Sequence, residues 1–179
     1  MKKVFVLIII FISLFKIYSE SNVNYGDSSY DIKKSIYKSE LIDNNMSLEI
    51  VDIKYIEDSK VIGFINGNRL GVCVFEKSED NKYILNTLQV INYQTTYNQF
   101  LIHYGENLER AIVIISTGED ISKVKITVNN KYNVIQDLDT KKPSMTIFNK
   151  NQININDNKV NYYLNFFDLD GKEINDSDI

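Results

Sequence analysis

The sequence predicts an all-β fold, an antiparallel β-sandwich of immunoglobulin-like or Greek-key type, over residues 46–179. Apolar residues recur with a period of two from Met46 onward, which is the period of a strand with one buried face. Turn residues interrupt this pattern about every ten residues, a spacing typical of sandwiches. The apolar fraction of 44% and the charged fraction of 25% are those of a globular chain with a packed core.

Residues 1–19 are predicted to be a signal peptide or a membrane anchor. Two lysines precede the segment 4–15, which is almost entirely apolar. A run of this length matches the apolar part of a signal peptide and is short of the roughly 20 residues that cross a bilayer. We expect cleavage after Ser19 or Ser21, and an uncleaved single-pass anchor is the alternative.

Residues 20–45 are predicted to form a linker that contains one short element. The stretch 20–31 is polar and has no periodicity, as expected for a linker. Ser28 and Asp31 have the spacing of a capping box, which favours a short helix near residues 29–42. The apolar residues that follow spread around a helical wheel, so an edge strand is the alternative.

Short strands account for most of the remaining chain. Each is an apolar or alternating run bounded by turn residues, and together they comprise 46–50, 51–55, 61–65, 70–75, 83–93, 100–104, 111–115, 124–128, 132–135, 145–148, 160–166 and 172–174. The change of parity at Ile50 and Val51 predicts a β-bulge or a break in the strand. Asn66-Gly67 and Asn129-Asn130 predict tight hairpins between the runs that flank them.

Two of these segments show how the core is arranged. Residues 111–115 are uniformly apolar, which predicts a central strand covered on both faces. Residues 124–128 alternate between apolar and polar side chains, which predicts a strand with one face in water. The predicted core residues are Val72, Val74, Ile112, Ile114, Val124, Ile126, Val128, Leu164 and Phe166.

Charge and cysteine content limit the partners. Loss of residues 1–19 removes three of the 20 basic residues and none of the 24 acidic ones, which leaves a net charge of −7. Such a surface repels nucleic acid and anionic membranes, so we expect membrane contact only through residues 1–19 if they stay uncleaved. Cys73 is the only cysteine, which excludes an internal disulfide. We expect a monomer stabilised by its core.

Residues for catalysis or metal binding are scarce. His103 is the only histidine, and no nucleophile motif surrounds any serine. Cys73 lies in an apolar strand and is expected to pack as a small hydrophobe. The segment 168–171, Asp-Leu-Asp-Gly, has its glycine at the fourth position of a calcium loop rather than the sixth, so a β-turn is favoured. We therefore predict no catalytic residues, no metal site and no cofactor.

Four pieces of sequence carry a resemblance to other proteins. They are the leader, the segment 71–77, Tyr104-Gly105 with the strand 124–128, and the closing segment 167–174. In these pieces the chain resembles a group of small exported β-rich proteins of unknown function from Gram-positive bacteria. The resemblance implies a sandwich fold and a Gram-positive cell envelope, and it implies no catalytic residues.

The functional prediction is an exported, noncatalytic β-sandwich module that binds a protein or a cell-envelope component. Tyr93, Tyr97 and Tyr104 lie near a polar loop, and a tyrosine cluster could bind a polar ligand. The alternative for these tyrosines is that they cap one end of the sandwich. The alternative for the whole chain is an extracellular hydrolase that uses carboxylates such as Glu106, Glu109 and Asp120.

Overall fold

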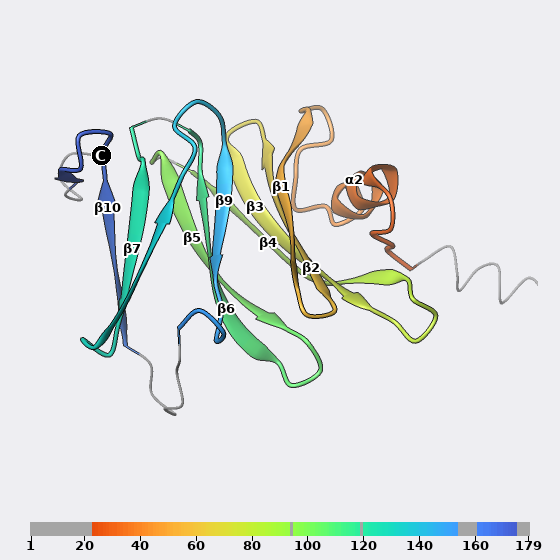
Figure 1. Cartoon of the computed structure of the whole chain (residues 1–179). Coiled ribbons are helices and arrows are strands. Elements are labelled where there is room, and N and C mark those ends of the chain that lie inside the picture. Colours follow the sequence, from red (N-terminus) through yellow and green to blue (C-terminus); the bar gives the residue numbers. More distant parts are fainter. Residues whose placement is uncertain (1–22, 94, 119, 154–160, 175–179) are drawn as a thin grey trace, which may run out of the picture.

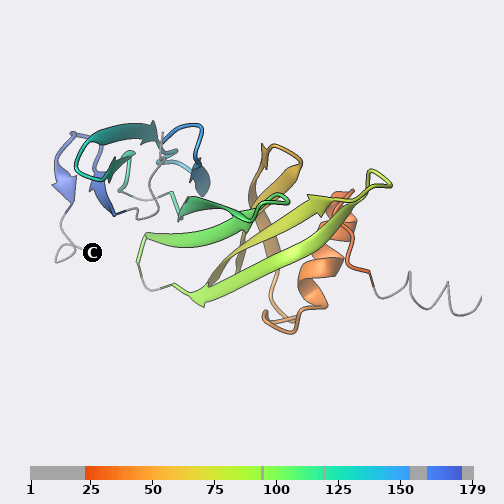
Figure 2. The same cartoon turned by 90° about the horizontal axis from the view of Figure 1, so that it is seen from below.

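The computed structural model consists of three stacked antiparallel β-sheets with one helix on the outer face of the first sheet (Figure 1). It describes residues 23–93, 95–118, 120–153 and 161–174. This arrangement confirms the predicted all-β antiparallel sandwich and adds a third sheet to it. Seen from below, the helix and the third sheet lie at opposite ends of the molecule, with the middle sheet between them (Figure 2).

Each sheet is built largely from neighbouring strands of the chain. The first sheet has the order β1 (Leu48–Ile56), β2 (Ser59–Asn66), β3 (Arg69–Lys77) and β4 (Tyr83–Asn92). The middle sheet has the order β5 (Tyr97–Tyr104), β6 (Glu109–Ser116) and β9 (Ser144–Phe148). The third sheet has the order β11 (Glu173–Ile174), β10 (Tyr162–Phe167), β7 (Lys123–Val128) and β8 (Tyr132–Asp137).

Strand β6 of the middle sheet is buried on both faces, as predicted for residues 111–115. Val113 and Ile115 of β6 pack towards the first sheet, whereas Ile112 and Ile114 pack towards the third. Successive side chains of a strand point to opposite faces, so an apolar strand can serve two cores at once. All predicted core residues are buried except Leu164, which is half-buried against the second of these cores.

The predicted bulge and hairpins are confirmed. The register between β1 and β2 shifts between Ile50 and Asp52. Asn66 pairs with Arg69 across the turn between β2 and β3. Asn129 and Asn130 turn the chain from β7 to β8 with positive φ values of 51° and 54°, a conformation that asparagine adopts more readily than most residues.

Helix α2 spans Ser29–Tyr37 and starts with the predicted capping box. The backbone N–H of Asp31 donates to Ser28 Oγ at 3.1 Å, and the N–H of Ser28 donates to Asp31 Oδ2 at 3.3 Å. Ile32 and Ile36, one turn apart, are buried in the core that covers the outer face of the first sheet. A single pair of apolar residues is therefore enough to attach this helix, although the wheel shows no continuous stripe.

The segment before the helix is attached to the first sheet, although the sequence predicts a linker there. The N–H of Gly26 donates to the carbonyl of Tyr83 at 2.8 Å, and the N–H of Leu85 donates to the carbonyl of Asn24 at 2.8 Å. The buried Lys60 donates from Nζ to the Gly26 carbonyl at 2.6 Å, and its Nζ lies 4.0 Å from the centre of the Tyr83 ring. The chain therefore joins the domain from Asn24 onward.

The predicted leader, residues 1–19, lies outside the described residues. Within the part of the chain that the structure describes, no helix is long and apolar enough to cross a membrane.

Candidate functional site

The three tyrosines predicted as ligand-binding residues do not form one cluster. Tyr104 is fully buried in the core between the first and middle sheets, and Tyr93 is half-buried against the same core. Tyr97 packs against the core between the middle and third sheets. Tyr97 and Tyr104 are seven positions apart in one strand, an odd number, so they lie on opposite faces and at opposite ends of β5.

Tyr97 lines an open groove of about 440 Å³ between β5 and β10. One wall is formed by Thr95 and the first three residues of β5, and the other by four residues of β10. The ring of Tyr97 stacks on that of Phe166 with 3.7 Å between the ring centres. Tyr163 is 58% exposed and forms part of the rim. All the lining side chains are uncharged, so the groove combines aromatic rings with neutral hydrogen-bonding groups.

One residue that lines the groove has a buried polar atom without a partner among the described residues. The side-chain nitrogen Nδ2 of Asn98, which lines the groove, is buried and has no hydrogen-bond partner among the described residues. A buried donor without an acceptor costs about 1–3 kcal/mol, so such atoms usually have a partner in the functional state. Asn98 follows Tyr97 along β5, so its side chain lies on the face of the strand towards the first sheet, opposite the Tyr97 ring.

The sequence identifies only Tyr97 among the residues of this groove. Tyr162 and Tyr163 were missed because β10 is far from β5 in the sequence, and nothing in the local pattern shows which strands become neighbours. The alternation from Val160 to Phe166 predicts the strand itself, and the structure confirms it for the described residues of β10. The missing information was the packing of the third sheet against the middle one.

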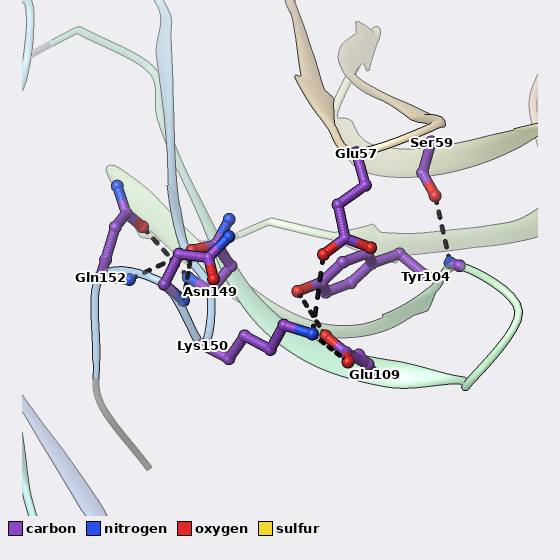
Figure 3. A network of polar contacts seen from close by, with 9 residues as sticks. Glu57, Ser59, Tyr104, Glu109, Asn149, Lys150 and Gln152 are labelled. Atoms are coloured by element: carbon purple, nitrogen blue, oxygen red, sulfur yellow. Dashed lines mark hydrogen bonds and ion pairs between the residues drawn. The ribbon is translucent and has the colours of Figure 1, made fainter.

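A network of polar contacts lies at the other end of β5 (Figure 3). Glu109 accepts a hydrogen bond from the Tyr104 hydroxyl at 3.1 Å and forms an ion pair with Lys150 Nζ. The same Nζ lies 3.6 Å from Glu57 Oε1. The side chains come from the turn between β1 and β2, from β5 and β6, and from the turn after β9. The network therefore connects the first sheet to the middle sheet.

A second set of contacts continues this connection. The N–H of Gly105 donates to Ser59 Oγ and to Glu76 Oε1, at 3.1 Å each. The hydroxyl of Ser59, which is fully buried, donates to Glu76 Oε2 at 2.5 Å. The Lys150 turn is held by Gln152, whose Oε1 accepts from the N–H of Asn149 at 3.1 Å (Figure 3). Each polar group here has a partner within the protein.

The protonation states of the network fit an ion pair rather than an acid–base pair. The hydrogen bond from Lys150 lowers the pKa of Glu109, and the same bond raises the pKa of Lys150. Burial raises the pKa of Tyr104, and its hydrogen bond to Glu109 acts in the same direction. At neutral pH Glu109 is therefore a carboxylate, Lys150 an ammonium and Tyr104 a neutral donor. A general acid would need a carboxyl group with a raised pKa.

Two carboxylates of the alternative hydrolase, Glu109 and Asp120, lie at opposite ends of β6. Glu109 begins β6 and Asp120 follows its other end, so the eight residues of this strand, about 26 Å long, separate them. Glycoside hydrolysis requires two carboxyl groups about 5–10 Å apart. Glu106 is exposed in the turn between β5 and β6. Glu109 and Asp120 therefore cannot act on one bond.

The remaining candidate residues lie apart from one another on β5, on β3 and in the turn after β10. His103 is exposed on β5, and Cys73 is fully buried, which raises the pKa of its thiol. The segment 168–171 forms the predicted β-turn, in which the N–H of Gly171 donates to the carbonyl of Asp168 at 3.1 Å. The part of the chain that the structure describes contains no group of three or more histidine, cysteine or carboxylate side chains that could hold a metal ion.

The pKa shift of Glu109 predicts a pH-dependent contribution to stability. A lowered pKa in the folded state stabilises the fold above the pKa of the unfolded chain, and this contribution disappears as the pH falls through the folded-state pKa. We therefore expect Glu109→Gln to lower the thermal midpoint at neutral pH, and the difference from wild type to shrink towards acid pH. Thermal unfolding across this pH range measures it.

Glu106→Gln is the matched control, because Glu106 is exposed in the adjacent turn. It should have little effect on the midpoint at any pH. A Glu109→Gln difference of the same size at neutral and acid pH would show that the charge of Glu109 is not what stabilises the network.

Comparison with known proteins yields no relative of this chain. No protein-family model matches it, and no curated protein or solved structure is significantly similar to it. The geometry of the described residues therefore has to support the functional argument without help from homology.

Proposed function

We propose that this chain is an exported, noncatalytic module that binds a protein or another cell-envelope component through the groove between β5 and β10. The observation that supports this best is the lining of the groove, in which aromatic and amide side chains are combined without any charge. Tyrosine rings offer an apolar surface with a polar tip, which suits contact with a partly polar partner. The volume of about 440 Å³ is within the range of binding sites.

The noncatalytic part of the proposal rests on the carboxylates. Glu109 is held ionised by Lys150, and the strand β6 separates it from Asp120. The polar network of Glu57, Glu109 and Lys150 connects two sheets, which is a structural role. The groove itself is lined by no carboxylate, histidine, lysine or cysteine side chain. Binding is therefore the activity that the groove chemistry supports.

Export is proposed from the sequence. Two lysines followed by the apolar segment 4–15 have the form of a signal peptide. The resemblance to exported proteins of Gram-positive bacteria points to the same compartment. The partner would then be a protein or envelope component outside the cytoplasm.

Crosslinking on intact cells that express the full chain tests this proposal. A membrane-impermeant crosslinker should capture this protein together with a specific partner, which mass spectrometry identifies. Tyr163→Ala changes the exposed rim of the groove and should reduce capture. Tyr30→Ala removes a tyrosine that is 72% exposed on α2, away from the groove, and should leave capture unchanged.

Four outcomes would contradict parts of the proposal or the predicted cleavage. Recovery of the protein without any partner would count against the binding function. Equal capture by the two tyrosine variants would place binding outside the groove. Soluble cytoplasmic protein that still begins at Met1 would refute export, whereas the intact chain in the membrane fraction would refute only cleavage.

A further inference from the structure

Strand β5 is an open edge of the middle sheet. It pairs with β6 over all eight of its residues, and no strand of the described residues pairs with its other side. The carbonyl of Leu101 accepts from Gln89 Nε2 at 2.8 Å, and the carbonyl of Tyr97 accepts from Thr95 Oγ1 at 2.6 Å, so both point away from β6. Because these groups alternate along a strand, the N–H and C=O of Gln99 also point away from β6.

The opposite wall of the groove, formed by β10, also has backbone groups that point away from its neighbouring strand. The carbonyls of Phe167 and Asn161 accept from Ser122 and Asn129, which lie at the two ends of β7. The odd-numbered residues of β10 therefore direct their backbone N–H and C=O groups towards β7. Leu164 is even-numbered, so its backbone groups point away from β7. Within the described residues β11 pairs only with Phe166 and Phe167. Free backbone groups thus occur on both walls.

Apart from the two side-chain hydrogen bonds to its outward carbonyls, the edge of β5 lacks the features that usually prevent a strand from pairing with another chain. Proteins protect sheet edges with charged residues, prolines, bulges or covering segments. The edge strand β1 has a bulge and three charged residues, and the edge of β4 is partly covered by residues 24–26. Strand β5 has no bulge, no proline and no acidic or basic residue other than His103, and its Leu101 is 44% exposed.

We propose that the groove binds an extended segment of a partner polypeptide as an additional β-strand along β5. This inference rests on the binding function proposed above and specifies its partner. Alternating donors and acceptors at the spacing of a strand are matched by another main chain, which is the basis of strand addition. The N–H and C=O of Gln99 bind the main chain of the segment. The uncharged lining selects an uncharged segment.

A displayed library of random linear peptides provides the probe. The full chain is used to select binders, and one selected peptide is synthesised for affinity measurements. Gln99→Pro removes the outward N–H without touching the ladder to β6, because proline is tolerated where an edge N–H faces solvent. We expect this variant to weaken binding by about tenfold or more.

Two matched variants separate the backbone from the side chain. Gln99→Ala keeps the N–H and should bind the peptide nearly as well as wild type. His103→Pro removes an N–H of the same parity further along β5, outside the groove, and should also bind normally. Circular dichroism of all three variants verifies that they are folded.

Amide hydrogen exchange on the unsubstituted protein gives a second readout that needs no variant. Addition of the peptide should slow exchange of the Gln99 N–H, which is free of the ladder. The N–H of Asn98 has the parity that bonds to β6, so its exchange should change less. A ligand that contacts only side chains would not produce this alternation.

The outcomes distinguish the two proposals. Peptides that bind without protecting Gln99, or that bind Gln99→Pro as well as wild type, refute strand addition and leave a protein-binding function standing. Equal loss in Gln99→Ala and Gln99→Pro shows recognition by the side chain and also refutes it. Failure to select any peptide, with binding of envelope oligosaccharides instead, overturns it. Protection of Gln99 that rises with protein concentration alone would make a second copy the occupant and overturn the proposed partner.

Discussion

Ile126→Ala is expected to lower the free energy of unfolding by about 2–5 kcal/mol. Ile126 is fully buried in the centre of β7, where it pairs with Leu164 of β10 on one side and Val134 of β8 on the other. Strands on both sides hold its backbone in place, so the space left by the lost atoms cannot close easily. Equilibrium unfolding in urea measures the difference.

Lys125→Ala is the matched control, because Lys125 precedes Ile126 and lies on the opposite face of the same strand. It should change the free energy of unfolding by no more than about 0.5 kcal/mol. Similar losses for the two variants would mean that β7 has no distinct buried face and would contradict the core between the middle and third sheets.

Gly118→Ala is expected to cost about 3–5 kcal/mol. Gly118 has φ of 98°, which L-residues rarely adopt, and an added Cβ would lie 2.5 Å from the carbonyl carbon of Lys142. Both obstacles involve the backbone, so no side-chain rotation can relieve them. The loss should appear in urea unfolding as a lower midpoint with an unchanged slope.

Gly171→Ala separates the cost of the positive φ from the cost of the close contact with the Lys142 backbone. Gly171 has a similar φ of 78°, but nothing lies within 4 Å of an added Cβ. This variant should therefore lose only the conformational part, about 1–2 kcal/mol. If Gly118→Ala lost no more than Gly171→Ala, the close approach to Lys142 would not be rigid in solution.

Features of the fold that depend on local sequence could be predicted. The strands, the bulge at Ile50 and the hairpin at Asn66-Gly67 follow from side-chain periodicity and turn residues within a few positions. The uniformly apolar stretch 111–115 even predicted a strand buried on both faces. The capping box at Ser28 identified the start of α2, because its two bonds involve residues only three positions apart.

Features that depend on distant partners could not be predicted. The attachment of Asn24 and Gly26 to β4 joins residues almost sixty positions apart, and the segment has no pattern of its own. The same reason explains why the residues of the groove could not be predicted together. Tyr97 could be named from its neighbourhood, whereas Tyr163 belongs to the groove only because the third sheet packs against the middle one. Single charged residues in turns, such as Lys150, likewise give no local signal.

The attachment of the chain at Asn24 determines how the groove would be presented at a cell surface. If residues 1–19 stay in a membrane, only residues 20–23 remain between that anchor and the domain, and a fully extended segment of this length reaches only about 14 Å. The first sheet would then lie next to the lipid. The groove lies on the side of the third sheet, away from α2 (Figure 1). An uncleaved chain would therefore direct its proposed binding site outward, towards molecules that approach from beyond the membrane.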